Sequence, residues 1–185
     1  MMLPTDTITD SAHNPVASRV FIRTPSEDDC RELLRLHQSS RAFHAPWVSP
    51  ALDEEGCQAY IARCQHEDFA GLLICHVQTK QIVGVANLSQ IFYRAFKSCY
   101  LGYYAGSAFA GQGLMTEGLR LVLIHAFTAL DLHRVEANIQ PENIASIRLV
   151  QRLGFAKEGY SPRYLFINGA WRDHERWAIT VEDWG

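Results

Sequence analysis

The stretch from Leu114 to Leu130 constrains the fold most, because its Leu, Val, Ile and Phe residues lie on more than one side of a helix. Such a helix must be largely buried, as happens when it crosses one face of a sheet. The chain has 185 residues, enough for one domain with a sizeable core. These features predict a single domain of the α/β (α+β) class.

The other elements follow from apolar periodicity and turn residues. Asn168-Gly169 between two apolar runs is a strong hairpin signal, and residues 41–50 are expected to form a loop. The order of the elements predicts a sheet with both meander and crossover connections. The expected strands are 19–23, 71–77, 82–91, 98–105, 134–139, 164–167 and 171–181, and the expected helices are 26–39, 53–65, 114–130 and 143–153.

Charge and composition exclude several classes of protein. The net charge of −3 argues against a general nucleic-acid-binding surface, and no apolar run approaches the roughly 20 residues that span a bilayer. Residues 1–17 are polar and lack the basic start and apolar centre of a signal peptide, so we predict a flexible leader followed by one domain over 18–185. We therefore expect a cytoplasmic protein that contacts neither membrane nor nucleic acid directly.

The cysteines and histidines indicate neither a disulfide framework nor a metal site. The chain has five cysteines, an odd number, and none of them forms a C-x-x-C pair. The eight histidines show no spacing typical of metal ligands. We expect reduced, mostly buried thiols and no metal.

The segment Gly111-Gln112-Gly113-Leu114-Met115-Thr116-Glu117-Gly118 joins a predicted strand to the long helix. Glycines let the backbone turn tightly and approach a ligand without a Cβ in the way. The N–H groups of the first helical turn have no partner within the helix and lie at the positive end of its dipole. The segment is neither a Walker A loop nor a G-x-G-x-x-G fingerprint, because position 116 is Thr. It predicts a phosphate cradle, with an ordinary strand-to-helix turn as the alternative.

This segment resembles motif A of the GNAT N-acetyltransferases, [Q/R]-x-x-G-x-[G/A], with Ala110 and Met115 as departures. Residues 132–138, Pro141-Glu142-Asn143 with Ser146, and 152–155 resemble the second half of that domain. Gly102-Tyr103, Gly113-Leu114-Met115, 158–160 and 169–174 are similar to the ribosomal-protein-alanine N-acetyltransferase branch, closest to the RimJ type. The resemblance covers roughly residues 18–184.

The resemblance implies a GNAT-like domain with a mixed, mostly antiparallel sheet, splayed central strands and helices on both faces. It implies acetyl-CoA as co-substrate, no metal, and transfer of the acetyl group to an amine. Backbone groups of Tyr103, Tyr104 and Ala105 would hold the acetyl carbonyl and the pantetheine arm. Asn143 would contact the cofactor, or cap its helix, or both. The pyrophosphate would lie on Gly111, Gln112, Gly113, Leu114, Met115 and Thr116.

The same resemblance suggests candidates for the catalytic acid and base. Many GNAT enzymes protonate the departing thiolate with a tyrosine, whose position here is Val150. Ser146 matches the serine assigned as general acid in the RimL branch, with a neutral surface serine as the alternative. Strand positions that carry a base elsewhere in the family hold Asn138 and Leu165. The remaining candidates for the base are Glu136, Asp173 and His174. Alternatively, Glu136 forms a structural salt bridge, and Asp173 and His174 orient the final hairpin.

The absence of an evident strong base bears on the acceptor. An N-terminal α-amine has a pKa of about 7.7–8.0 and a lysine side chain about 10.4, so only the former is appreciably neutral at pH 7. This favours a protein N-terminus, by resemblance the N-terminal alanine of a small-subunit ribosomal protein. The alternatives are a small amine (polyamine, amino acid or aminoglycoside) and a ribosome-assembly factor that binds acetyl-CoA without essential catalysis. Residues expected to shape the acceptor side are Phe43, His44, Trp47, Tyr160, Arg163, Tyr164 and Trp171.

Overall fold

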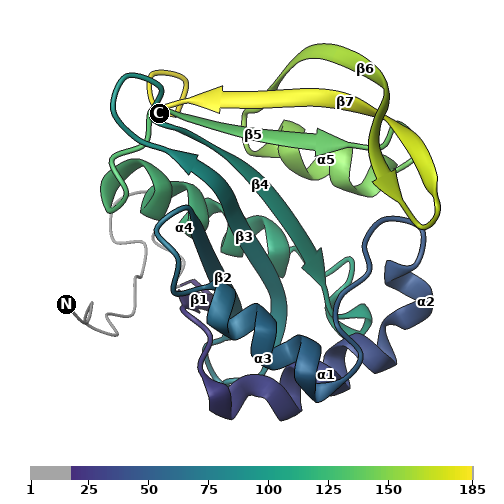
Figure 1. The fold of residues 1–185 in the computed structure, drawn as a ribbon. Helices are drawn as coiled ribbons and strands as arrows, with labels where there is room; N and C mark the ends of the chain where they lie inside the picture. Colours follow the sequence, from purple (N-terminus) through teal and green to yellow (C-terminus); the bar gives the residue numbers. More distant parts are fainter. Residues whose placement is uncertain (1–17, 185) are drawn as a thin grey trace.

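One seven-stranded sheet organises the protein in the computed structural model, which describes residues 18–184 (Figure 1). The predicted leader, 1–17, lies outside the described residues. The strand order is β1-β2-β3-β4-β5-β7-β6, and only the β4–β5 pair is parallel. The predicted mixed, mostly antiparallel sheet is therefore confirmed. The strands are β1 (Val20–Arg23), β2 (Phe69–His76), β3 (Ile82–Phe92), β4 (Ser98–Ala105), β5 (Arg134–Ile139), β6 (Ala156–Ile167) and β7 (Ala170–Thr180).

Helices cover both faces of the sheet, as predicted. The long helix α4 (Leu114–Thr128) and α5 (Ile144–Arg152) bury their apolar residues in a cluster with one face. Helices α1 (Cys30–Ser39) and α3 (Glu54–Arg63) pack in a second cluster on the other face. Figure 1 shows α1 and α3 in front of the sheet and α4 behind it. Two 3₁₀ turns, η1 (Glu27–Asp29) and η2 (Ser107–Phe109), precede α1 and α4.

Strands β4 and β5 separate in the middle of the sheet. They pair only from Ser98 to Tyr100 on β4 and from Arg134 to Glu136 on β5, although both strands continue beyond this point. Their ends diverge in Figure 1. The separation leaves one edge of β4 open in the centre of the molecule, which confirms the predicted splayed strands.

Two predictions are wrong: the loop at residues 41–50 and the start of the strand predicted at 164. Residues 41–50 contain a short helix, α2 (Arg41–His44), which a buried contact of His44 with β4 helps to hold. Strand β6 begins at Ala156 and not at 164. Its first half is largely exposed and its register with β7 shifts twice, so it lacks the apolar alternation by which a strand is recognised.

Helix α4 lies very close to β2 at Gly118. A Cβ there would be 2.5 Å from Cγ2 of Ile74, a fully buried side chain. Alanine favours a helix by about 1 kcal/mol over glycine, but overpacking costs about 1–3 kcal/mol. We expect Gly118→Ala to lower the free energy of unfolding by about 1–2 kcal/mol in urea denaturation. The control is Gly102→Ala, since no heavy atom lies within 4 Å of a Cβ at Gly102. Equal stability of the two variants would contradict the close approach.

Candidate active site

The loop between β4 and α4 turns at two glycines in the left-handed region. Gly111 has φ +75° and Gly113, the N-cap of α4, has φ +79°. Residues with a side chain rarely adopt this conformation. Among residues 18–184, no heavy atom lies within 4 Å of a Cβ built on Gly111, so these residues leave the space above it open to a ligand.

Five consecutive amide groups of this loop are free. Within residues 18–184, the N–H groups of Gly111 to Met115 donate to no backbone or side-chain acceptor, and the first bonded amides are those of Thr116 and Glu117. They lie at the positive end of the α4 dipole. Open space, free donors and positive potential together fit an anionic group such as a pyrophosphate.

Arg19, the residue before β1, contacts this loop through hydrogen bonds. Its guanidinium donates to Gln112 O at 3.0 Å and, through Nε, to Glu117 Oε1 at 2.8 Å. Glu117 also accepts from the Arg19 amide at 3.1 Å. Sequence reasoning missed Arg19, and no local pattern marks it, because its partners are distant in the chain.

The open edge of β4 presents alternate backbone groups. Gly106 N donates to Val83 O at 2.8 Å, and Tyr104 is paired with Val85 two residues along, so the polar groups of Tyr104 point toward β3. Those of Tyr103 and Ala105 point the other way, into the gap beside β5. The buried ring of His44 reaches this edge and its Nε2 donates to Ala105 O at 2.7 Å. Tyr103 and the Ala105 amide remain open.

Helix α5 lines the gap with polar groups of its first turn. Asn143 is the N-cap, and its Oδ1 accepts from Ser146 N at 3.2 Å. Ser146 Oγ lies 2.5 Å from the Tyr103 hydroxyl. Burial raises the pKa of Tyr103 to about 12, and the hydrogen bond with Ser146 opposes this rise. Val150, at the position that carries a tyrosine in many GNAT enzymes, is fully buried in the core and has no polar group to offer.

Glu136 and the two positions that carry a base elsewhere in the family, Asn138 and Leu165, differ in their surroundings. Glu136 accepts from Arg134 Nε at 2.8 Å, and the same guanidinium binds Glu158, which supports the salt-bridge interpretation. Asn138 Oδ1 is buried and has no hydrogen-bond partner in the described part of the chain. Leu165 lies on β6 and is apolar and exposed. None of these residues is a strong base facing the gap.

Asp173 and His174 on β7 have separate roles. Asp173 accepts from Arg163 N at 2.7 Å and from the Tyr160 hydroxyl at 2.5 Å, which holds the irregular part of β6. His174 is buried, and its Nδ1 donates to Arg172 O at 3.0 Å. Burial lowers the pKa of His174, and this outweighs the opposing effects of Arg172 O, Asp173 and Glu142. The imidazole is therefore neutral, with its tautomer set by Arg172.

The β6–β7 hairpin, which carries several of the residues expected on the acceptor side, meets the segment after α2. Asn168 in the hairpin turn donates to Ala45 O and accepts from Ser49 Oγ at 2.7 Å. Figure 1 shows the hairpin beside α2. Exposed aromatic rings surround this junction on loops and strand ends, where recognition residues are common. They include Phe43, Tyr160, Phe166 and Trp171.

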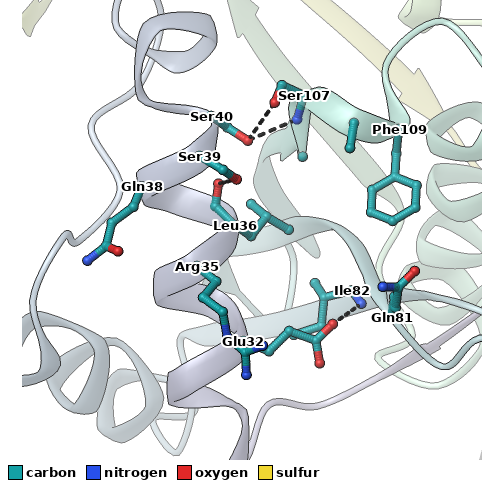
Figure 2. Close-up of a pocket in the computed structure, with 12 residues that line it drawn as sticks. Glu32, Arg35, Leu36, Gln38, Ser39, Ser40, Gln81, Ile82, Ser107 and Phe109 are labelled. Carbon is teal, nitrogen blue, oxygen red and sulfur yellow. Dashed lines mark hydrogen bonds between the residues drawn. The ribbon is translucent and has the colours of Figure 1, made fainter.

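A separate hollow of about 690 Å³ lies between α1 and the loop after β4 (Figure 2). Figure 2 shows Leu36 on α1 pointing toward Phe109 across it and Glu32 pointing toward Ile82. Glu32 Oε1 accepts from Ile82 N at 2.7 Å, and Ser40 Oγ accepts from Ser107 N at 2.9 Å. Its polar groups are mostly engaged within the protein, and no predicted site residue lines it. The candidate site is therefore the β4–β5 gap and not this hollow.

The described residues contain no group of three or more His, Cys, Asp or Glu side chains arranged to hold a metal ion. All five cysteines are free thiols. None of the helices described is long and apolar enough to cross a membrane.

Comparison with known proteins places this geometry among acetyltransferases. The family described as acetyltransferase (GNAT) domain matches residues 19–156. The [ribosomal protein uS5]-alanine N-acetyltransferase of Escherichia coli is 36% identical over 175 residues, which cover 90% of each chain. The structure of Mycobacterium smegmatis RimJ in complex with CoA-disulfide superposes with a TM-score of 0.82 at 30% identity, covering 89% of this chain and 83% of that one. That of the ribosomal-protein-S5-alanine acetyltransferase from Vibrio fischeri has a TM-score of 0.81 at 27% identity, covering 90% and 96%.

Proposed function

The chain belongs to the GNAT acetyltransferase family, and from this premise we propose that it acetylates the N-terminal α-amine of a ribosomal protein, with alanine as the first residue. As a member of this family it is an acetyl-CoA-dependent N-acetyltransferase. The choice of acceptor is supported by relatives that share the full length of the domain. The observation that carries the proposal is the opened edge of β4 leading to five free amides at the start of α4.

We assign the pyrophosphate of acetyl-CoA to Gly111–Thr116, because this loop offers free donors and Gly111 has open space above it in the described part of the chain. The pantetheine arm would run along β4, and its amides would pair with the open groups of Tyr103 and Ala105. The backbone N–H and C=O groups of Tyr104 point toward β3, so they would not pair with the cofactor; Tyr104 only connects the two residues that would. Asn143 keeps Nδ2 free to donate to the cofactor while its Oδ1 caps α5.

The reaction follows from this placement. A neutral amine attacks the thioester carbonyl, and the resulting oxyanion would accept from the open amides of β4. When the C–S bond breaks, its electron pair goes to sulfur, and Ser146 would donate a hydrogen bond to the thiolate. Water then supplies the thiol proton and receives the proton that the acceptor nitrogen loses. His174 on β7 is a buried imidazole and would be the candidate for a base that acts through water.

The small-amine and assembly-factor alternatives make different demands on the chain. A polycationic acceptor favours a cleft lined with acidic groups, yet Glu136 and Asp173 are both engaged by neighbouring donors. An assembly factor would retain acetyl-CoA binding and show no turnover. We place the reaction in the cytoplasm, where ribosomal proteins are made, and expect no direct contact with nucleic acid or membrane.

Ser146→Ala tests the assignment of Ser146 as the hydrogen-bond donor to the departing thiolate. We expect kcat to fall roughly ten- to a thousandfold, near or below the usual contribution of one general acid. The dissociation constant of acetyl-CoA should change little, because the hydrogen bond is needed only as the C–S bond breaks. Ser39→Ala, which removes a helix hydroxyl bound to Leu36 O, serves as the control for kcat. Full turnover with Ala at 146 would show that the thiolate needs no hydrogen bond from Ser146, and a large loss of affinity would make Ser146 a binding residue.

A further inference from the structure

We propose that Tyr103 is a positioning residue for acetyl transfer, whose phenol hydroxyl donates to Ser146 Oγ and turns the serine hydrogen toward the β4–β5 gap. The inference rests on the proposed function, in which Ser146 faces the departing thiolate. In this proposal the side chain of Tyr103 positions Ser146, whereas its backbone groups pair with the pantetheine arm.

The two hydroxyls meet across the opening of the sheet. Tyr103 lies on β4 on the same face as Cys99 and Leu101, and Ser146 lies in the first turn of α5, which follows β5 in the chain. Their oxygen atoms are 2.5 Å apart, and the Tyr103 hydroxyl is also 3.3 Å from Ser146 O. Among the described residues Ser146 is the only hydrogen-bond partner of this phenol. The contact links the two halves of the sheet at the place where β4 and β5 separate.

The chemistry of the two groups indicates which one donates. Burial raises the pKa of Tyr103 to about 12, which is still well below the pKa of water, about 15.7, that an alkyl hydroxyl resembles. The phenol is thus the stronger donor and the serine the better acceptor. A serine that accepts from Tyr103 retains one hydrogen of its own. Without the phenol, this hydroxyl is free to rotate and donate to a carbonyl of the preceding turn, as helix serines commonly do.

The same comparison disfavours Tyr103 as the proton source. A thiol such as that of CoA has a pKa near 8.5 if it behaves like cysteine, so a phenol with a pKa of about 12 does not protonate its thiolate. Tyr103 therefore acts through Ser146 by holding and polarising it. The hydroxyls of Tyr103 on β4 and Ser146 on α5 would together supply a hydrogen bond to the thiolate. In many GNAT enzymes a tyrosine at the position of Val150 acts on that thiolate.

The experiment compares Tyr103→Phe, Ser146→Ala and the double variant, using acetyl-CoA and a peptide that begins with alanine. We expect Tyr103→Phe to lower kcat roughly five- to fiftyfold, less than a full general acid contributes, with the acetyl-CoA affinity within about twofold. The double variant should lose no more than Ser146→Ala alone, because the two residues act as a unit. The control is Tyr60→Phe, which removes another buried phenol, bound to Asn87 Oδ1 at 2.8 Å, and should retain full kcat.

A second readout requires no acceptor. A hydrogen bond from Ser146 to the thiolate lowers the pKa of the bound CoA thiol, which is measured from thiolate absorbance with desulfo-CoA as the blank. Tyr103→Phe should raise this pKa nearly as far as Ser146→Ala does, and Tyr60→Phe should leave it unchanged. If Ser146→Ala alters neither kcat nor the thiol pKa, the proposed role of Ser146 fails. If Ser146→Ala alters them and Tyr103→Phe does not, or if the losses multiply in the double variant, the inference alone is overturned.

Discussion

Gly113→Asp is expected to weaken acetyl-CoA binding about a hundredfold or more, which corresponds to at least about 2.7 kcal/mol. The new side chain would stand at the N-cap of α4, where its carboxylate competes with the pyrophosphate for the same free amides. It would also bring a negative charge next to an anionic ligand. Isothermal titration calorimetry with acetyl-CoA measures the change in affinity directly.

Gly113→Asn is the matched control for this variant. Asparagine has nearly the same shape, tolerates φ +79° comparably and carries no charge, so it separates the electrostatic effect from backbone strain. We expect Asn to lose less affinity than Asp by about tenfold. The free energy of unfolding should change by less than about 1 kcal/mol in both variants, because left-handed strain and capping oppose each other. Unchanged affinity for Gly113→Asp would show that the pyrophosphate lies elsewhere.

A peptide with a free N-terminal alanine is expected to react at pH 7 about a hundred times faster than a lysine-only peptide with a blocked N-terminus. About a tenth of α-amines are neutral at this pH, against less than a thousandth of lysine side chains. An enzyme without a strong base uses whatever neutral amine is already present, and the residues around β5 show no such base. Thiol release from acetyl-CoA measures both rates under the same conditions.

The pH profile separates this explanation from one based on shape alone. For the α-amine, kcat/KM should rise about tenfold per pH unit and level off near 7.7–8.0, whereas for lysine it should still be rising at pH 9. Spermidine, a third acceptor, would exceed both peptides if the small-amine alternative is correct. Equal rates for the two peptides at pH 7 would contradict the argument from amine pKa and point to a base such as His174.

Local sequence signals predicted much of the fold. The bounds of β4 and β5 and the start of α4 match the predicted ones, because each rests on alternation, helical periodicity or a glycine turn within a few residues. The hairpin at Asn168-Gly169 also follows from local turn chemistry. The start of β6 was missed, because its exposed and bulged half is held by Asp173 from β7 and not by an apolar pattern of its own.

The candidate site likewise has features that local sequence predicts and contacts that it does not. The glycine cradle and the cap at Asn143 were predicted, since both depend on backbone conformation within one turn of the chain. No sequence pattern indicated that Arg19 braces the loop, that His44 bonds to Ala105, or that Tyr103 meets Ser146.

The sequence by itself thus determined most of the elements and the family, and it predicts that residues 111–116 hold the phosphates. Which side chains share the gap was decided only when the sheet packed between its two helix layers. Each of those contacts joins groups from different strands and helices, and their distances and burial are set by the packing of the whole domain, not by the neighbours of either residue along the chain.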